Sequence, residues 1–182
     1  ITLDRGLDRI FNVRTRAVIE NSLAVSEDYL RDHAQIVRAD IITISTDIAR
    51  AKSLFDQDRE RFRQFLTAQA SLRGLPAAVM IDKNLEVVER SNIRTSLEFI
   101  TPAKAALENI TESEPQIALI PDANYVAAVI KLRNFTDTYL YIARALDPRV
   151  VSQLRETRAS VSEYAELASR RLGVQVAFGL MY

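Results

Sequence analysis

The sequence predicts an α+β fold in which a long N-terminal helix packs on an antiparallel or mixed β-sheet and a C-terminal helix follows. Three observations predict it. The stretch from Leu7 to Phe55 contains no glycine or proline and repeats apolar residues at helical spacing. Residues 77–146 contain short β-branched runs separated by turn residues. Asp147-Pro148 then combines a helix cap with proline at the first helical position.

The N-terminal helix carries a heptad pattern in its second half. From Leu30 to Phe55 the apolar residues alternate by four and three positions, the spacing of a seam that packs along a partner surface. Before Leu23 the apolar residues are sparser and lie between several arginines. We therefore expect residues 1–22 to form a stalk or a dimer seam, and the seam from Leu30 onward to face the core.

Local signals predict the remaining elements. Asp56 and Asp58 are candidate N-caps of a second helix, which Gly74 ends and Pro76 prevents from restarting. A short helix is expected from Thr101-Pro102 to about Ile110, and the closing helix from Pro148 through Leu172. The expected strands are residues 77–82, 85–90, 117–120, 125–133 and 138–146.

The composition excludes several functions. The 24 basic and 24 acidic residues give a net charge of zero, so no overall field attracts nucleic acid. The chain has no cysteine and one histidine, which argues against zinc sites, thiol catalysis and disulfides. No glycine-rich phosphate loop is present. We expect no catalytic residue, metal or cofactor here, and we interpret His33 as a helix residue near the seam that could also report pH.

The hairpin of residues 125–146 offers one candidate binding site. If Arg133 opposes Thr138, the register places Tyr125, Lys131, Arg133 and Arg144 on one face and an almost wholly apolar set on the other. Three cations beside a tyrosine suit a small anionic or carboxylate-bearing ligand. The alternative is that this face is polar because it is the wet outer side of a half-exposed sheet.

Both ends of the chain resemble a known family. Leu3–Phe11, Arg14–Arg16 and Glu20–Leu30 resemble the segment that follows a membrane span in the NtrY-type nitrogen-regulation sensor histidine kinases of proteobacteria. The uncharged Gly173–Tyr182 resembles the start of that family's next span. The order of a long helix followed by a mixed sheet is also similar to the PDC/Cache class of extracytoplasmic sensors.

The resemblance implies an extracytoplasmic signal-sensing region at the periplasmic face of the bacterial inner membrane, anchored by flanking spans. Its kinase part, on which a cognate response regulator acts, would lie outside this chain, so this region itself is expected not to be an enzyme. We expect residues 1–22 to form a membrane-proximal stalk, 23–146 the sensor domain, and 147–182 a C-terminal helix leading into a span. The expected partners are a second copy, paired through the long helix, and a small anionic or amino-acid-like ligand. Binding of a ligand or partner would be relayed through the terminal helices.

Two alternatives remain. A structural or partner-docking domain, or a chemoreceptor-type sensor without a small ligand, predicts a closed sheet with no cavity beside Lys131, Arg133 and Arg144. A small hydrolase would need a polar constellation in a cleft that the sequence does not show.

Overall fold

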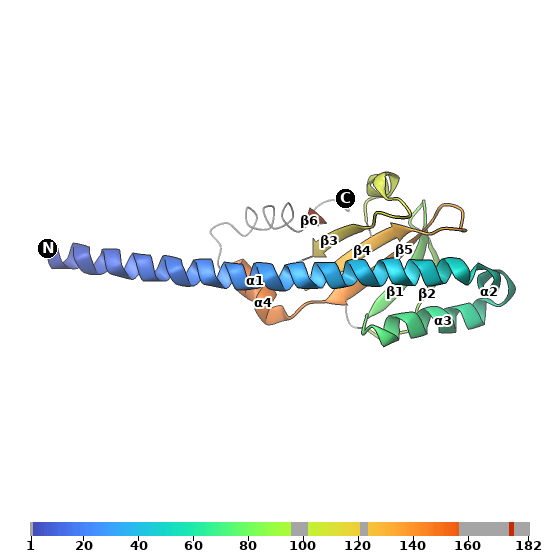
Figure 1. The fold of residues 1–182 in the computed structure, drawn as a ribbon, viewed down its shortest axis with the longest axis horizontal. Coiled ribbons are helices and arrows are strands. Elements are labelled where there is room, and N and C mark those ends of the chain that lie inside the picture. Colours follow the sequence, from blue (N-terminus) through green and yellow to red (C-terminus); the bar gives the residue numbers. More distant parts are fainter. Residues whose placement is uncertain (1, 96–101, 121–123, 157–174, 177–182) are drawn as a thin grey trace.

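A long helix crosses one face of a β-sheet in the computed structural model, which describes residues 2–95, 102–120, 124–156 and 175–176. Helix α1 comprises Thr2–Arg50, and its N-terminal part extends beyond the rest of the domain (Figure 1). At Ala51 the backbone N–H is shared between the carbonyls of Asp47 and Ile48, and α2, Lys52–Gln57, follows. The predicted helix to Phe55 is therefore divided at Ala51.

The sheet has six strands in the order β2-β1-β5-β4-β3-β6. The strands are β1 Ala77–Asp82, β2 Val87–Arg90, β3 Gln116–Ile120, β4 Tyr125–Lys131, β5 Thr138–Ala145 and β6 Gln175–Val176. Neighbours among β1 to β5 are antiparallel, and β6 pairs in parallel with β3. The predicted α+β class is confirmed.

Helix α3, Arg59–Leu72, begins and ends where its local signals lie. Asp58 is its N-cap and accepts a hydrogen bond from the Arg61 N–H at 3.1 Å, whereas Asp56 pairs with Lys52. At the other end Gly74 has φ +67°, and the N–H of Leu75 bonds back to the carbonyl of Ala70 at 2.9 Å. This is a Schellman motif, and it confirms Gly74 as the residue that ends the helix.

The two later helices differ in how closely they follow the sequence. The segment expected as a helix to Ile110 is a 3₁₀ helix, η1, at Lys104–Asn109. Helix α4 is Pro148–Glu156, and Asp147 caps it by accepting the Arg149 N–H at 2.9 Å. The expected continuation to Leu172 lies outside the described residues, and Gln175–Val176, which we placed at the approach to a membrane span, form β6.

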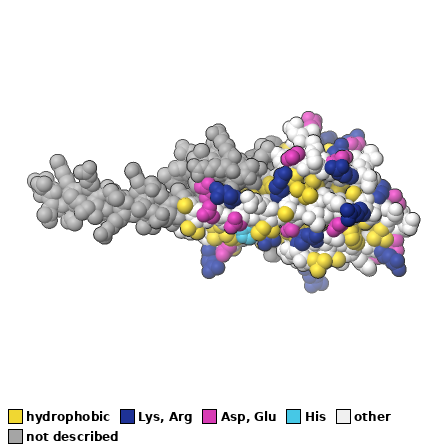
Figure 2. Space-filling view, viewed as in Figure 1, with side chains coloured by type: hydrophobic (Ala, Val, Ile, Leu, Met, Phe, Trp, Pro, Cys, Tyr) yellow, Lys and Arg dark blue, Asp and Glu magenta, His cyan; other side chains and the backbone are white. Residues whose placement is uncertain are grey.

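The sheet is buried on both faces. On the α1 side, the predicted seam is confirmed, with Leu30 and Ala34 at most 4% exposed and Val37, Ile41, Ile44 and Ile48 fully buried. These residues pack with α3 and with the strand residues Ile130, Leu140 and Ile142. The opposite face packs Tyr125, Tyr139 and Tyr141 with Leu107 and Ile110. On the face shown in Figure 2, acidic and basic side chains are interspersed, in keeping with the zero net charge.

The register of the β4–β5 hairpin differs by one residue from the expected one. Lys131 pairs with Tyr139, and the N–H of Leu132 donates to the carbonyl of Thr138, so Arg133 does not oppose Thr138. The turn is longer than expected, and within it Asn134 and Asp137 both adopt left-handed conformations, with φ of 68° and 48°. The predicted common face for Tyr125, Lys131, Arg133 and Arg144 is therefore wrong.

Candidate ligand-binding pocket

The four residues predicted to bind a ligand lie in different places. Tyr125 is fully buried, and it shares the face away from α1 with the half-buried Lys131. Arg133 lies exposed in the turn. Arg144 lies on the α1 face, where its Nε donates to Nδ1 of His33 at 3.0 Å. The structure does not bring the four together, and their role in ligand binding stays a prediction.

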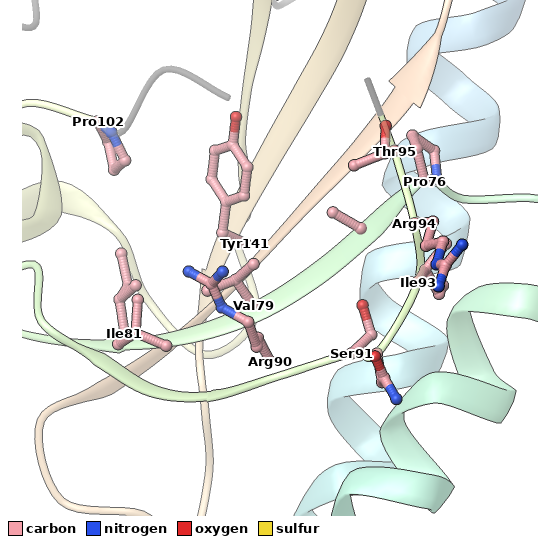
Figure 3. A pocket seen from close by; sticks show the side chains of 13 residues that line it. Pro76, Val79, Ile81, Arg90, Ser91, Ile93, Arg94, Thr95, Pro102 and Tyr141 are labelled. Carbon is pink, nitrogen blue, oxygen red and sulfur yellow. The ribbon is translucent and has the colours of Figure 1, made fainter. Parts of the chain in front are cut away.

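A pocket of about 800 Å³ lies elsewhere, on the sheet face away from α1. Its floor is formed by outward side chains of β1 and by Tyr141 of β5, and its wall by β2 and the segment that follows it (Figure 3). The lining residues are Pro76, Ala77, Val79, Ile81, Val87, Arg90, Ser91, Asn92, Ile93, Arg94, Thr95, Pro102 and Tyr141. The volume falls within the range of small-molecule sites, about 300–1,000 Å³.

The charged side chains of the described pocket lining are both cationic. Arg90 and Arg94 both belong to its wall, and the Arg90 guanidinium lies below the Tyr141 ring in Figure 3. Ser91, Asn92 and Thr95 add hydroxyl and amide groups. Among the described lining residues there is no aspartate or glutamate. The pocket therefore combines an apolar floor with positive charge at its wall, which suits an anion with a carbon skeleton.

Alternation along β2 turns Arg90 toward the pocket and its neighbour Glu89 toward α3. The Glu89 side chain is 6% exposed, and it accepts hydrogen bonds from Arg63 at 2.8 Å and from Arg59 at 3.4 Å. Burial of the carboxyl favours its neutral form, but Arg63, the Arg90 N–H and Arg59 together outweigh burial and lower the pKa of Glu89. The ionised carboxylate thus holds β2 against α3.

The segment after β2 is also held by hydrogen bonds. Ser91 donates its N–H to the carbonyl of Ala78 at 2.8 Å and accepts the Ala78 N–H on Oγ at 3.0 Å. The N–H of Asn92 donates to Oγ1 of Thr67 on α3 at 2.9 Å. The wall that carries Arg90 and Arg94 is therefore connected to both β1 and α3.

Tyr141 connects the pocket to Tyr125. Burial raises the pKa of the Tyr141 phenol, and the charge interaction and hydrogen bond with Tyr125 raise it further, so Tyr141 is a neutral phenol at physiological pH. Tyr125 lies on the neighbouring strand β4 and is not among the residues that line the pocket. Sequence reasoning missed Arg90, Arg94 and Tyr141, although the two arginines lie at and just after the end of a predicted strand.

In the described part of the chain, no three histidine, aspartate or glutamate side chains gather closely enough to hold a metal ion. Nor does any helix in the described ranges combine the length and apolar character needed to cross a bilayer.

The described residues thus form an α+β domain with a cation-walled pocket on the sheet face away from its long helix. The chain belongs to the family described as the NtrY N-terminal region, which matches residues 4–181. The NtrY-type resemblance of its two ends is confirmed, whereas the PDC/Cache likeness stays a prediction. No solved structure matches the chain.

The chain is similar over its whole length to the nitrogen regulation protein NtrY of Azorhizobium caulinodans, with 50% identity over 182 residues, or 24% of that protein. It is 21% identical over 181 residues, 99% of this chain and 30% of the relative, to a putative NtrY-like sensor histidine kinase of Rickettsia bellii. A putative NtrY-like sensor histidine kinase of Rickettsia conorii is 24% identical over 178 residues, covering 94% of this chain and 29% of the relative. The chain therefore spans between 24% and 30% of the length of these relatives.

Proposed function

We propose that this region is the signal-sensing domain of a membrane-bound sensor histidine kinase and that it binds a small organic anion in the pocket of Arg90, Arg94 and Tyr141. The observation that carries the proposal is the pair of arginines in the wall of a pocket with an apolar floor. The names of the relatives support the kinase part of the proposal, because they include sensor histidine kinases.

The charges of the pocket favour one class of ligand. A carboxylate or similar anion gains charge-assisted hydrogen bonds from the two guanidinium groups. An amino acid also carries an ammonium group, which needs a carboxylate partner when it leaves water. The screen therefore compares organic acids with the corresponding amino acids, since the described lining offers two guanidinium groups for the carboxylate. A short carbon skeleton would lie against Val79 and Ile81.

Relay of the signal would use the helix on the far side of the sheet. Strand β5 contributes Tyr141 to the pocket and, on its other face, packs Leu140 and Ile142 against α1. A ligand that favours one arrangement of β5 would shift the population of α1 positions. In this proposal α1 and the C-terminal segment lead into flanking spans, the domain lies on the periplasmic side, and the kinase part passes the signal to a response regulator.

Dimerisation through α1 is part of the proposal. Residues 5–20 would pair across two copies, while the seam from Leu30 to Ile48 is occupied by the core. This chain has no cysteine, so single cysteines at successive positions from 7 to 19, in a full-length protein with any cysteines elsewhere replaced, provide a crosslinking test. Disulfide crosslinks that recur every three or four positions would support a helical dimer seam. Uniformly absent crosslinks in the full-length, membrane-inserted protein would contradict it.

Ligand binding is tested first by a thermal-shift screen of organic acids, amino acids and other nitrogenous metabolites against this chain. For any compound that raises the Tm, titration calorimetry on Arg90→Gln and Arg94→Gln should show affinity weakened about tenfold or more, because each variant loses a charge-assisted hydrogen bond. Lys131→Gln is the matched control, since Lys131 lies on the same sheet face but does not line the pocket.

The results separate the possible sites. Loss of affinity in Lys131→Gln or Arg133→Gln, with Arg90→Gln unchanged, would move the site to the hairpin that the sequence predicted. A screen in which no anion binds would leave a structural or partner-docking domain as the better explanation.

Relay of the signal is tested in the full-length protein in membranes. There the ligand should change the rate of autophosphorylation, and Arg90→Gln should remove that change.

A further inference from the structure

Two hydrogen bonds outside the pocket join helix α1 to the end of β5 and to the connection that leads from β5 into α4. Nε of Arg144 donates to Nδ1 of His33 at 3.0 Å. The backbone N–H of Asp147, the cap of α4, donates to the Tyr29 hydroxyl at 2.6 Å. The rings of Tyr29 and His33, one helical turn apart, have centroids 4.2 Å apart. We call these four residues the α1–β5–α4 joint.

The Arg144–His33 hydrogen bond requires a neutral imidazole. Nδ1 accepts the Arg144 N–H only while it carries no proton of its own. Protonation of His33 would place a donor opposite a donor and one positive charge beside another, so the contact would change from attractive to repulsive. Tyr29 packs on the same imidazole and would be disturbed with it.

Some charged groups around the joint lower the pKa of His33 and others raise it. Burial and the charge of Arg144 lower the pKa of His33, and Asp32 on its own helix opposes them in part. Asp40 lies further along α1, and its Oδ1 is 3.8 Å from Nε of Arg73, the residue after α3. Burial raises the pKa of the Asp40 carboxyl, and the charges of Arg73 and Arg144 oppose that rise in part. On the α4 side Asp147 pairs with Arg149 at 3.1 Å. Arg144 is thus the cation closest to His33, and no carboxylate is hydrogen bonded to the imidazole among the described residues.

We propose that the α1–β5–α4 joint is a pH-sensitive contact, closed while His33 is neutral and opened when His33 takes up a proton. Opening breaks the hydrogen bond from Arg144 to His33, which releases the end of β5 from α1. It also breaks the hydrogen bond from the Asp147 N–H to Tyr29, which releases the cap of α4 from α1. Tyr141 lies three residues before Arg144 on the same strand, so the joint and the pocket are connected through β5. The inference stands on the contacts of the joint and needs no ligand in the pocket.

The test is an NMR pH titration of this chain, in which His33 is the only imidazole. Between pH 7.5 and 5 we expect the imidazole, the Arg144 Nε–H and the Asp147 amide to change together with one midpoint below 6.5. The hydrogen-exchange protection factor of the Asp147 amide, corrected for intrinsic exchange, should fall by about five- to tenfold, the ratio that corresponds to one lost hydrogen bond. The Met80 amide in β1 serves as the control and should keep its protection, because Met80 pairs with Glu89 of β2, away from the joint.

His33→Asn separates titration from packing, because its amide oxygen can accept the Arg144 N–H without taking up a proton. Asp147 protection should then stay constant over the same pH range. Constant protection in the unsubstituted chain, or a His33 titration that leaves the Arg144 signal unchanged, would overturn the inference. None of these outcomes depends on whether an anion binds between Arg90 and Arg94.

Discussion

The hydrogen bond from Arg144 Nε to His33 Nδ1 connects strand β5 to helix α1 across 111 positions of the chain. It exists because the hairpin register turns Arg144 to the α1 side of the sheet. A shift of one residue would have moved Arg144 to the opposite face, where the sequence analysis expected it. The observed register therefore removes Arg144 from the predicted binding face and gives His33, the one histidine of the sequence, a hydrogen-bond partner.

This relationship predicts how stability depends on pH. Because the pKa of His33 is lower in the folded chain, the unfolded chain binds more protons between that value and 6.5. The unfolding free energy should therefore be highest above about pH 6.5 and fall as the pH drops through the folded-state pKa, levelling off below it. Urea denaturation at half-unit pH steps from 8 to 5 measures this directly.

His33→Asn is the control for that pH series, and its unfolding free energy should vary much less between pH 8 and 5. The other shifted groups act mainly at lower pH. Glu89 and Asp147 have lowered pKa values, so their stabilisation is present above 4.5 and 3.8 and is lost only at more acid pH. Asp40, whose pKa burial raises, has the opposite sign and becomes less unfavourable as the pH falls. Equal slopes in the two proteins would show that His33 is not the titrating group.

The sequence predicted those elements whose signals are local. The side chain of Asp58 caps the start of α3, and the left-handed φ of Gly74 ends that helix. Pro148, which lacks an N–H, is the first residue of α4. The heptad seam from Leu30 to Ile48 was predictable because burial on a helix repeats every three or four residues.

The hairpin register was not predictable because both of its faces are buried. All of β4 except Lys131 is buried, so no polar and apolar alternation distinguishes one register from the next. The observed register goes with a longer turn, in which Asn134 and Asp137 adopt left-handed conformations. The pocket was missed for a related reason: its lining comes from β1, β2, β5 and Pro102, whose proximity exists only in the folded sheet.

Replacing Gly74 should destabilise the chain through its backbone alone. Gly74 has φ +67°, and a Cβ at this position would meet no atom within 4 Å. Gly74→Ala should therefore cost about 1 kcal/mol, the usual cost of a left-handed conformation for a residue with a side chain. Gly74→Asn should cost less, because asparagine tolerates this region. Urea midpoints at pH 7.5 check the order; an alanine variant as stable as the original would contradict the Schellman assignment.

Two adjacent isoleucines of α1 provide a matched test of core packing. Ile41 is fully buried against the sheet, and Ile42 is 38% exposed. Ile41→Ala should cost about 2–5 kcal/mol, because it leaves a cavity between α1 and the strands. Ile42→Ala should change the free energy of unfolding by no more than about 0.5 kcal/mol. Similar losses in both variants would mean that the face of α1 that packs on the sheet is assigned wrongly.

Glu89 should affect both stability and ligand binding although it does not line the pocket. Its buried carboxylate holds β2 against α3 through Arg63 and Arg59, and the next residue along β2, Arg90, lies in the pocket wall. Glu89→Gln keeps the shape of the side chain but removes its charge, so we expect a loss of about 1.5–3 kcal/mol in the free energy of unfolding at neutral pH. Because the pKa of Glu89 is lowered, that difference should shrink as the pH falls below 4.5 and the original carboxylate becomes protonated.

The matched control is Glu86→Gln in the same hairpin, where the side chain is exposed and a loss of at most about 0.5 kcal/mol is expected. For an anion found in the screen, Glu89→Gln should weaken binding measurably in calorimetry because the wall that positions Arg90 is less firmly held, and Glu86→Gln should not. If Glu89→Gln is destabilised yet binds the anion with unchanged affinity, the contact with α3 stabilises the fold without positioning Arg90.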